Sequence, residues 1–229
     1  MQLCENQFGK FNSSIRIDDD RKKKIESAFE HFTDFSKTDP EISTASDGHP
    51  FLQGSMATHT IVKPLKGGEF DVDIVYPFKL AALRAGITPA EIRDWFFRRL
   101  RNDHFYNENL ISKPRCARIE YKGEFHLDII PARKGEGLES SFYFIPTKDS
   151  LGWKKTTPLA FRYWVQNIDE KSGGKNAEGA GRFVRCVRIM KRWRDRNFIE
   201  TSALPSIALT AILGQHEATN SQNVRPPLQ

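Results

Sequence analysis

Two aspartates one residue apart inside an apolar segment are the first residues whose types and spacing suggest chemistry. In the segment FDVDIV, Asp71 and Asp73 alternate with Phe70, Val72 and Ile74. Because successive side chains of a strand point to opposite faces, we expect both carboxylates on one face and the apolar side chains on the other. Paired carboxylates raise each other's pKa and cost stability unless a cation lies between them. Mg2+ takes such oxygen ligands and is the expected partner, with Mn2+ as the alternative.

A third aspartate lies in a later apolar segment with the same alternation. In EFHLDIIPA, Phe125, Leu127 and Ile129 alternate with His126 and Asp128. If the two strands are neighbours, Asp128 joins the pair. Three carboxylates on adjacent strands can hold two metal ions about 3.5–4 Å apart, the arrangement of metal-assisted phosphoryl transfer. Asp128 is then expected to bind the ion that activates the attacking hydroxyl and to accept its proton.

A turn of small residues precedes the aspartates. In the tripeptide QGS, Gly54 permits close approach of the backbone to a phosphate, and Ser55 can donate both its N–H and its O–H. Neither a Gly-Ser pair nor a D-x-D pair is specific by itself, since ordinary turns and exposed strands contain both. The order QGS, then D-x-D in a strand, then a third aspartate in a later apolar strand is much more specific, and it favours phosphoryl transfer.

Strands and helices that could position these residues are also predicted. Thr88, Pro89 and Glu91 supply capping signals for one helix start. Apolar periodicity and the Lys122-Gly123 turn indicate the other elements. In chain order, the predicted elements are a helix over 20–36, a helix over 88–103, a hairpin of strands 114–121 and 124–131, and a short strand near 140–145.

From Thr157 onward the pattern becomes helical. Three helices are predicted over PLAFRYWVQNI, GRFVRCVRIMKRWRDRNF and LPSIALTAILGQ, and the Gly-rich segment KSGGKNAEGAG between the first two is predicted to be a loop. The predicted fold is therefore α/β. A small, mixed, twisted sheet carries the aspartates, the helices 20–36 and 88–103 flank it, and a helical lobe follows.

Composition limits the classes of function. With 35 Lys and Arg against 29 Asp and Glu, the net charge of +6 suits phosphate-bearing partners. The three cysteines show no C-x-x-C spacing, so neither a disulfide framework nor a zinc site is indicated. No apolar run approaches the roughly 18 residues of a membrane span, and the first residues lack the apolar core of a signal peptide. A cytoplasmic location without a membrane partner is the default expectation.

The segments QGS, FDVDIV and HLDIIPA resemble the nucleotidyltransferases of the polymerase-β superfamily, and specifically the cGAS/DncV-like bacterial enzymes (CD-NTases) of anti-phage (CBASS) signalling. The resemblance continues through GWKKTTPLAFRYWV, VRIMKRW and LPSIAL and covers roughly residues 50–213. It implies a nucleotidyltransferase core at 1–155 and a helical lobe at 156–229 that closes the nucleotide cleft. Members usually continue for many tens of residues beyond the LPS segment, so three alternatives stay open for the lobe: it is incomplete at its C-terminal end, completed by a partner, or naturally minimal.

The resemblance also assigns nucleotide-binding residues. Lys191 in RIMKRW corresponds to the lysine, and Ser206 in LPS to the serine, that contact the donor triphosphate. Gln53, Gly54 and Ser55 fall at the turn that holds the nucleotide. On charge patterning alone, Lys191 is predicted to be a surface lysine, and Ser206 is equally well explained as a helix N-terminal residue.

The implied function is metal-dependent synthesis of a cyclic di- or trinucleotide second messenger from ribonucleoside triphosphates, with ATP and also GTP, UTP or CTP as substrates. An operon-encoded regulator and a nucleotide-activated effector are implied by the resemblance alone. A first alternative is a template-independent enzyme that extends RNA or makes linear oligoadenylate with the same carboxylates. A second is a non-catalytic nucleotide- or RNA-binding module that uses basic helices, such as the run Arg98, Arg99 and Arg101. RNA is the less favoured partner.

Overall fold

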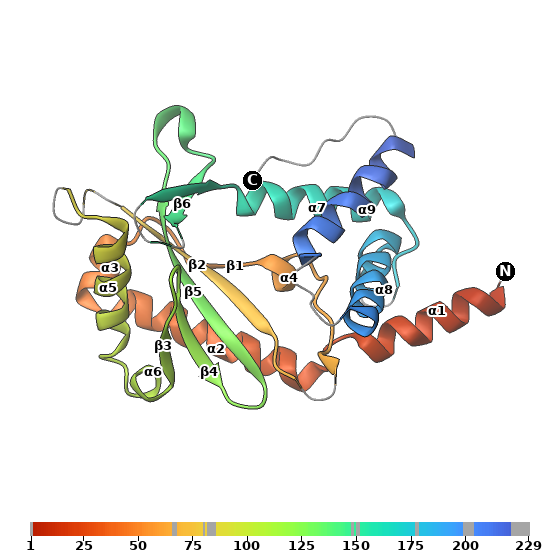
Figure 1. The fold of residues 1–229 in the computed structure, drawn as a ribbon, viewed down its shortest axis with the longest axis horizontal. Coiled ribbons are helices and arrows are strands. Elements are labelled where there is room, and N and C mark those ends of the chain that lie inside the picture. Colours follow the sequence, from red (N-terminus) through yellow and green to blue (C-terminus); the bar gives the residue numbers. More distant parts are fainter. Residues whose placement is uncertain are drawn as a thin grey trace. The chain divides into compact units, whose positions relative to one another are not determined.

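The computed structural model describes residues 2–65, 68–79, 81, 86–147, 149, 152–176, 179–198 and 204–220 (Figure 1). Its helices are α1 (Gln2–Ile15), α2 (Asp19–Thr38), α3 (Pro40–Ala45), α4 (Gly54–Ala57), α5 (Pro89–Leu100), α6 (His104–Asn109), α7 (Pro158–Ser172), α8 (Arg182–Asn197) and α9 (Ser206–Asn220). Its strands are β1 (Phe51–Gln53), β2 (Asp71–Phe78), β3 (Leu110–Ser112), β4 (Ala117–Tyr121), β5 (Phe125–Lys134), β6 (Tyr143–Pro146) and β7 (Trp153–Thr156).

The chain divides into two compact units. Unit 1 comprises the described residues within Met1–Asp19, Gly54–Gly68 and Leu159–Leu228, and unit 2 comprises those within Asp20–Gln53 and Glu69–Pro158. Unit 2 contains the strands together with α2, α3, α5 and α6. Unit 1 contains α1, α4, α7, α8 and α9, and in it α1 packs against α8 although the two helices lie far apart in the sequence.

The sheet of unit 2 is mixed. Its strand order is β1-β2-β5-β4-β3, and β6 pairs with both β5 and β7. Strands β2 and β5 run parallel, whereas the other pairs of strands run antiparallel. The predicted α/β class with a small mixed sheet is therefore confirmed.

The connection between β4 and β5 is one residue longer than the two-residue turn that the sequence predicts. The N–H of Glu124 donates to the carbonyl of Tyr121 at 2.9 Å and closes a four-residue turn, so the ladder begins with the pair Tyr121 and Phe125. Gly123 adopts a positive φ of 77°, which glycine accepts without steric cost. The hairpin itself is confirmed, but its register is shifted by one residue.

Aromatic side chains join the two predicted flanking helices to the sheet. Phe32 of α2, Tyr76 of β2 and Phe96 of α5 are fully buried, and each ring contacts the other two with centroids 5.3–6.3 Å apart. The Thr88 capping box of α5 is present as predicted. This helix ends earlier than expected because Asp103 caps a separate short helix, α6, through the N–H of Tyr106.

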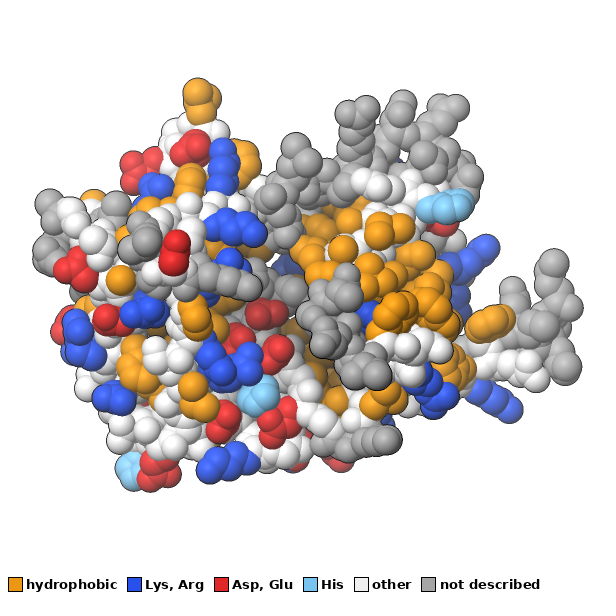
Figure 2. Space-filling model, viewed as in Figure 1, with side chains coloured by type: hydrophobic (Ala, Val, Ile, Leu, Met, Phe, Trp, Pro, Cys, Tyr) orange, Lys and Arg blue, Asp and Glu red, His pale blue; other side chains and the backbone are white. Residues whose placement is uncertain are grey.

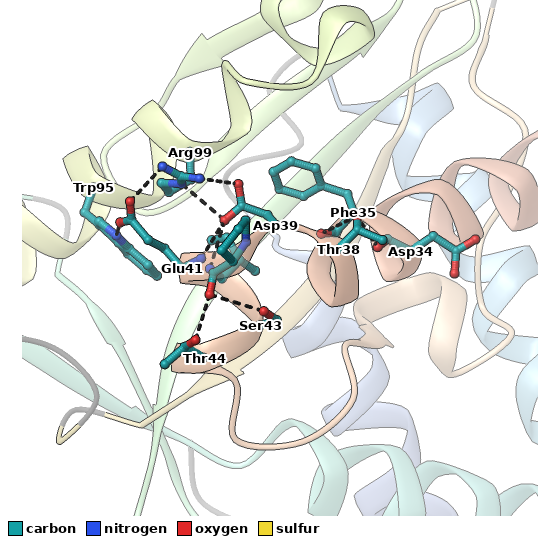
Figure 3. A network of polar contacts seen from close by, with 11 residues as sticks. Asp34, Phe35, Thr38, Asp39, Glu41, Ser43, Thr44, Trp95 and Arg99 are labelled. Carbon is teal, nitrogen blue, oxygen red and sulfur yellow. Dashed lines mark hydrogen bonds and ion pairs between the residues drawn. The ribbon is translucent and has the colours of Figure 1, made fainter.

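Asp39 links α2, α3 and α5 in unit 2 (Figure 3). Its Oδ1 accepts from the backbone N–H groups of Glu41 and Ile42 and caps α3. Arg99 of α5 donates Nε and Nη2 to the Asp39 carboxylate at 3.2 and 2.6 Å, and Nη1 to Glu41 at 2.7 Å. Glu41 also accepts from the indole N–H of Trp95. Arg99, one of the arginines considered for nucleotide binding, is thus engaged in contacts within the unit.

We expect Asp39→Ala to lower the free energy of unfolding by about 2–3 kcal/mol, because it removes a helix cap and leaves Arg99 without its buried partner. Urea titration followed by circular dichroism measures the change. Asp34→Ala, at an exposed position of α2, is the matched control and should stay within about 0.5 kcal/mol of the wild type. Equal stability of the two variants would show that the Asp39 contacts contribute nothing.

The helices of unit 1 enclose their own apolar core, formed by Trp164, Val165, Ile168, Ala180, Phe183, Val184 and Val187. Asp169 of α7 caps α8, because its carboxylate accepts from the N–H groups of Gly181 and Val184, both at 2.8 Å. The three helices predicted for the C-terminal part are confirmed. Figure 2 shows hydrophobic side chains gathered over this unit, and Tyr163 and Ile212 are among the exposed ones.

Helix α1 is not predicted by the sequence pattern. Its apolar repeat of Phe8, Phe11 and Ile15 is short, and the remaining residues are mostly polar. Its packing against α8 therefore depends on tertiary contacts. None of the described helices combines the length and the hydropathy of a membrane span.

Candidate functional site

Strands β2 and β5 bring the predicted aspartates together. The two strands run parallel in a register that pairs Asp73 with Asp128 and Asp71 with His126. Residues two apart on a strand share a face, so the three carboxylates and His126 lie on one face of the sheet. The alternating residues Val72, Ile74, Leu127 and Ile129 are fully buried. The condition under which Asp128 joins the pair is therefore met, because its strand is the neighbour of the strand with Asp71 and Asp73.

The three carboxylates have different environments. The side chain of Asp71 is 57% exposed, Asp73 is half-buried, and the side chain of Asp128 is only 13% exposed. Burial, together with the like charges of Asp128 and Asp71, raises the pKa of Asp73 to about 7, although the positive charge of Arg118 opposes the shift. Without further positive charge, Asp73 is therefore only partly ionised at neutral pH.

Arg118 of β4 binds two of the three carboxylates. Its Nε donates to Asp128 Oδ1 at 2.7 Å, and its Nη2 donates to Asp128 Oδ2 and to Asp71 Oδ1, both at 2.8 Å. The bidentate hydrogen bond to Asp128 raises the pKa of Arg118 further above its usual high value. The side chain, 18% exposed, is thus a permanent cation between Asp71 and Asp128.

His126 and Glu69 extend this polar cluster. His126 Nε2 lies 2.6 Å from Glu69 Oε2, and its Nδ1 lies 3.3 Å from both Arg118 Nη1 and Asp71 Oδ1. His126 therefore lies beside the carboxylates and contacts Glu69, Asp71 and Arg118.

The donor set suits a hard divalent ion. Asp71, Asp73 and Asp128 supply carboxylate oxygens, which Mg2+ and Mn2+ prefer, and a cation would relieve the repulsion that raises the pKa of Asp73. Among the residues that the structure describes, no group of three or more His, Cys, Asp or Glu side chains is gathered closely enough to hold a metal ion. The guanidinium of Arg118 contacts two of the predicted ligands, Asp71 and Asp128.

The QGS tripeptide follows the edge strand β1. Gln53 is the last residue of that strand and lies opposite Asp73 in the antiparallel pair β1·β2. Gly54 comes next, with a φ of 64°, and opens the single turn α4. The carbonyl of Ser55 accepts a hydrogen bond from the N–H of Thr60 at 2.9 Å, and this bond closes the end of the turn. The positive φ explains why a glycine occupies this position, since other residues rarely adopt it.

Lys191 and Ser206 are both engaged within unit 1. The ammonium of Lys191 donates to the carbonyl and the hydroxyl of Thr60, both at 3.0 Å, and the residue is only 3% exposed. Burial, followed by the like charge of Arg194, lowers the pKa of Lys191 to about 7. Ser206 Oγ accepts from Arg194 Nη1 at 3.0 Å. The surface position that charge patterning predicts for Lys191 is wrong, since its side chain turns into the unit.

Sequence reasoning missed Arg118. With the expected two-residue turn at Lys122-Gly123, Ala117 would lie opposite Asp128. The additional turn residue moves the register by one position and places Arg118 there. An arginine ten residues before Asp128 in a hairpin is a detectable signal, but only once the length of the turn is known.

The fold, a small mixed sheet with aspartates on adjacent strands, is similar to that of solved nucleotidyltransferases of the CD-NTase type. The CD-NTase CdnG of Bradyrhizobium diazoefficiens, solved in complex with GTP, matches with a TM-score of 0.67 at 18% identity, over 91% of this chain and 68% of that chain. The chain has the polymerase-β-like nucleotidyltransferase fold that the resemblance predicts.

The chain belongs to the family described as Second Messenger Oligonucleotide or Dinucleotide Synthetase domain (SMODS), whose model matches residues 1–169. The c-di-GMP synthase of Roseivirga ehrenbergii is 27% identical over 164 residues, which cover 72% of this chain and 43% of that protein. The cyclic GMP-AMP synthase of Escherichia albertii is 25% identical over 180 residues, which cover 72% of this chain and 36% of that protein. The chain thus spans about two fifths of the length of these curated relatives. The predicted CD-NTase membership is confirmed.

Proposed function

We propose that this chain is a divalent-metal-dependent nucleotidyltransferase that joins ribonucleoside triphosphates into a cyclic di- or trinucleotide second messenger. Its core, residues 1–155, contains the carboxylates, and its helical lobe, residues 156–229, contributes to nucleotide binding. The observation that supports the proposal most strongly is the parallel register that pairs Asp73 with Asp128, with Asp71 on the same face, in a chain of the SMODS family.

Each candidate residue has a role that its chemistry suits. Asp71, Asp73 and Asp128 would hold the divalent ions, which when bound neutralise phosphate charge and lower the pKa of the attacking hydroxyl. A 3′- or 2′-hydroxyl of one nucleotide attacks the α-phosphate of another, pyrophosphate leaves, and a second transfer closes the ring. Asp128, whose side chain is more buried than that of Asp71, is suited to accept the hydroxyl proton.

The remaining residues would bind the donor nucleotide. Gly54 and Ser55 offer backbone and hydroxyl donors to its phosphates, and Gln53 precedes them at the edge strand. The ammonium of Lys191 would give up its hydrogen bonds to Thr60 and contact the triphosphate. The hydroxyl of Ser206 would give up its hydrogen bond from Arg194 and bind a phosphate oxygen. An ammonium paired with phosphate regains its charge, which burial disfavours in the structure as it stands.

Product analysis tests the proposal directly. Purified protein is incubated with Mg2+ or Mn2+ and the four ribonucleoside triphosphates, treated with phosphatase and examined by mass spectrometry, beside the Asp71→Asn/Asp73→Asn variant. A phosphatase-resistant cyclic product that the variant does not form is the expected result, and its mass identifies the bases and the ring size. Linear products would contradict cyclisation and favour the oligonucleotide- or RNA-extending alternative.

The biological setting is part of the same proposal. The cyclic nucleotide would act in the cytoplasm in anti-phage defence, together with an operon-encoded regulator and an effector that the nucleotide activates. The family description as a second-messenger synthetase supports such a role. Phage challenge of cells that carry the complete operon is expected to lose protection when the wild-type gene is replaced by the Asp71→Asn/Asp73→Asn form.

A further inference from the structure

Arg118 makes its closest polar contacts with the predicted metal ligands. Three of its hydrogen bonds end on carboxylate oxygens: both oxygens of Asp128 and Oδ1 of Asp71. Charge-assisted bidentate bonds of this kind are among the stronger polar contacts in proteins. The residue is therefore placed by the same carboxylates that the proposed reaction requires.

The backbone holds Arg118 in this position. Strand β4 pairs with β5 so that Arg118 lies opposite Asp128, and β5 pairs with β2 so that Asp128 lies opposite Asp73. Three consecutive strands thus present an arginine and two aspartates in one row across the sheet. Because the row is set by ladder hydrogen bonds, the contact does not depend on a mobile loop.

A guanidinium and a divalent ion compete for these oxygens. Each neutralises the repulsion between the carboxylates, and the two cations repel each other if both lie among them. We propose that Arg118 is a built-in counter-cation, which occupies the carboxylate cluster in the metal-free protein and must be displaced from Asp71 and Asp128 when the divalent ion binds. This inference rests on the proposed metal-dependent function. Arg118 is thus a positioning residue that sets the affinity of the site for metal.

Removal of Arg118 is expected to have opposite effects on stability and on metal affinity. Removal of Arg118 leaves three carboxylates without a counter-charge, so the metal-free protein loses stability. The same removal frees the oxygens for a divalent ion, so metal binds more tightly. A purely structural arginine that orients Asp128 for the metal would produce the reverse effect on affinity.

Mn2+ binding without nucleotide tests this inference. The dissociation constant is measured by the electron paramagnetic resonance of free Mn2+ for the wild type, Arg118→Met, Arg118→Lys and the control Arg93→Met, an arginine of α5 paired with Asp94. We expect Arg118→Met to bind Mn2+ about tenfold more tightly, with Arg118→Lys and Arg93→Met close to the wild type. The melting temperature in EDTA should fall in Arg118→Met and recover on addition of Mn2+.

Equal or weaker Mn2+ binding by folded Arg118→Met would overturn the inference. The Asp71→Asn/Asp73→Asn variant separates this failure from a failure of the proposed function. If that variant loses Mn2+ binding while Arg118→Met matches the wild type, the metal site stands and only the counter-cation role is wrong. If Mn2+ affinity is unchanged both in Asp71→Asn/Asp73→Asn and in Arg118→Met, the proposed metal site and the counter-cation role are both wrong.

A measurement on the wild-type protein removes the dependence on variant folding. The Nε–H of Arg118, assigned by comparison with Arg118→Lys, gives a side-chain NMR signal that the bond to Asp128 Oδ1 shifts and protects from exchange. Saturation with Mg2+ is expected to move this signal and to speed its exchange with water. A signal that Mg2+ leaves unchanged would contradict displacement of the guanidinium.

Discussion

The Asp71→Asn/Asp73→Asn variant is expected to lose nucleotidyl transfer by on the order of 1,000-fold. Carboxamides coordinate divalent ions much more weakly than carboxylates, and metal stabilisation of the transition state is worth several kcal/mol, at 1.36 kcal/mol for each tenfold in rate. Initial rates of pyrophosphate release measure the loss. Asp94→Asn removes one negative charge from an exposed position of α5 that is not part of the cluster, and it should keep the wild-type rate.

Substitution in the same cluster should raise the stability of the metal-free protein even though it lowers activity. Since the pKa of Asp73 is raised to about 7, from about 3.9 in an unfolded chain, the folded protein retains a proton that the unfolded chain has released. Asp73 by itself is therefore expected to lower the stability of the metal-free wild type as the pH rises from about 4 to about 7. In EDTA at pH 8, Asp73→Asn should be more stable than the wild type by on the order of 1–3 kcal/mol, and this gain should vanish below about pH 4.

These two readouts together identify a functional cluster. A variant that is less active and more stable indicates that the wild type tolerates repulsion between carboxylates for the sake of metal binding. If Asp73→Asn were both active and destabilised, the carboxylates would be structural, and the non-catalytic binding module would become the better explanation.

The second large effect is expected at Lys191. Because burial lowers the pKa of this lysine from 10.5 to about 7, the unfolded chain binds its proton more tightly than the folded protein does. The wild type should therefore gain stability as the pH rises above 7, by roughly 2–3 kcal/mol between pH 7 and pH 9 from this residue alone. Lys191→Met removes that part of the pH dependence.

Urea titrations at several pH values measure the effect as a difference between the two proteins, which cancels the titration of all other groups. Lys171→Met, at an exposed position near the end of α7, is the matched control and should retain the wild-type pH profile. A Lys191→Met profile parallel to that of the wild type would mean that Lys191 keeps its proton in the folded state.

Lys191 also provides a test of its proposed contact with the donor triphosphate. At pH 8 the buried amine is mostly neutral, and a phosphate beside it favours the protonated form. Binding of ATP should therefore be accompanied by the uptake of up to about one proton. Calorimetry in two buffers of different ionisation enthalpy measures this uptake, and identical values for the wild type and Lys191→Met would contradict the contact.

Much of the site could be predicted from alternation in short segments. Asp71, Asp73 and Asp128 each interrupt an apolar run at strand period, so their faces follow from the local geometry of a strand. The capping signals at Thr88 and the periodic apolar residues of α2 and α8 are equally local, and the structure confirms these helices. Local patterns therefore determined the class of fold and the shared face of the three carboxylates, and they predict a cation beside them.

Tertiary structure decided what surrounds those carboxylates. One additional turn residue, Glu124, set the β4·β5 register that places Arg118 opposite Asp128, and a turn of two or three residues around Lys122-Gly123 satisfies the same sequence signals. Lys191 shows the same limit: its arginine-rich helix indicates a solvated face, yet the side chain is buried against Thr60, 131 positions away in the sequence. Side-chain partners across such separations depend on register and packing, and neither is encoded in a local pattern.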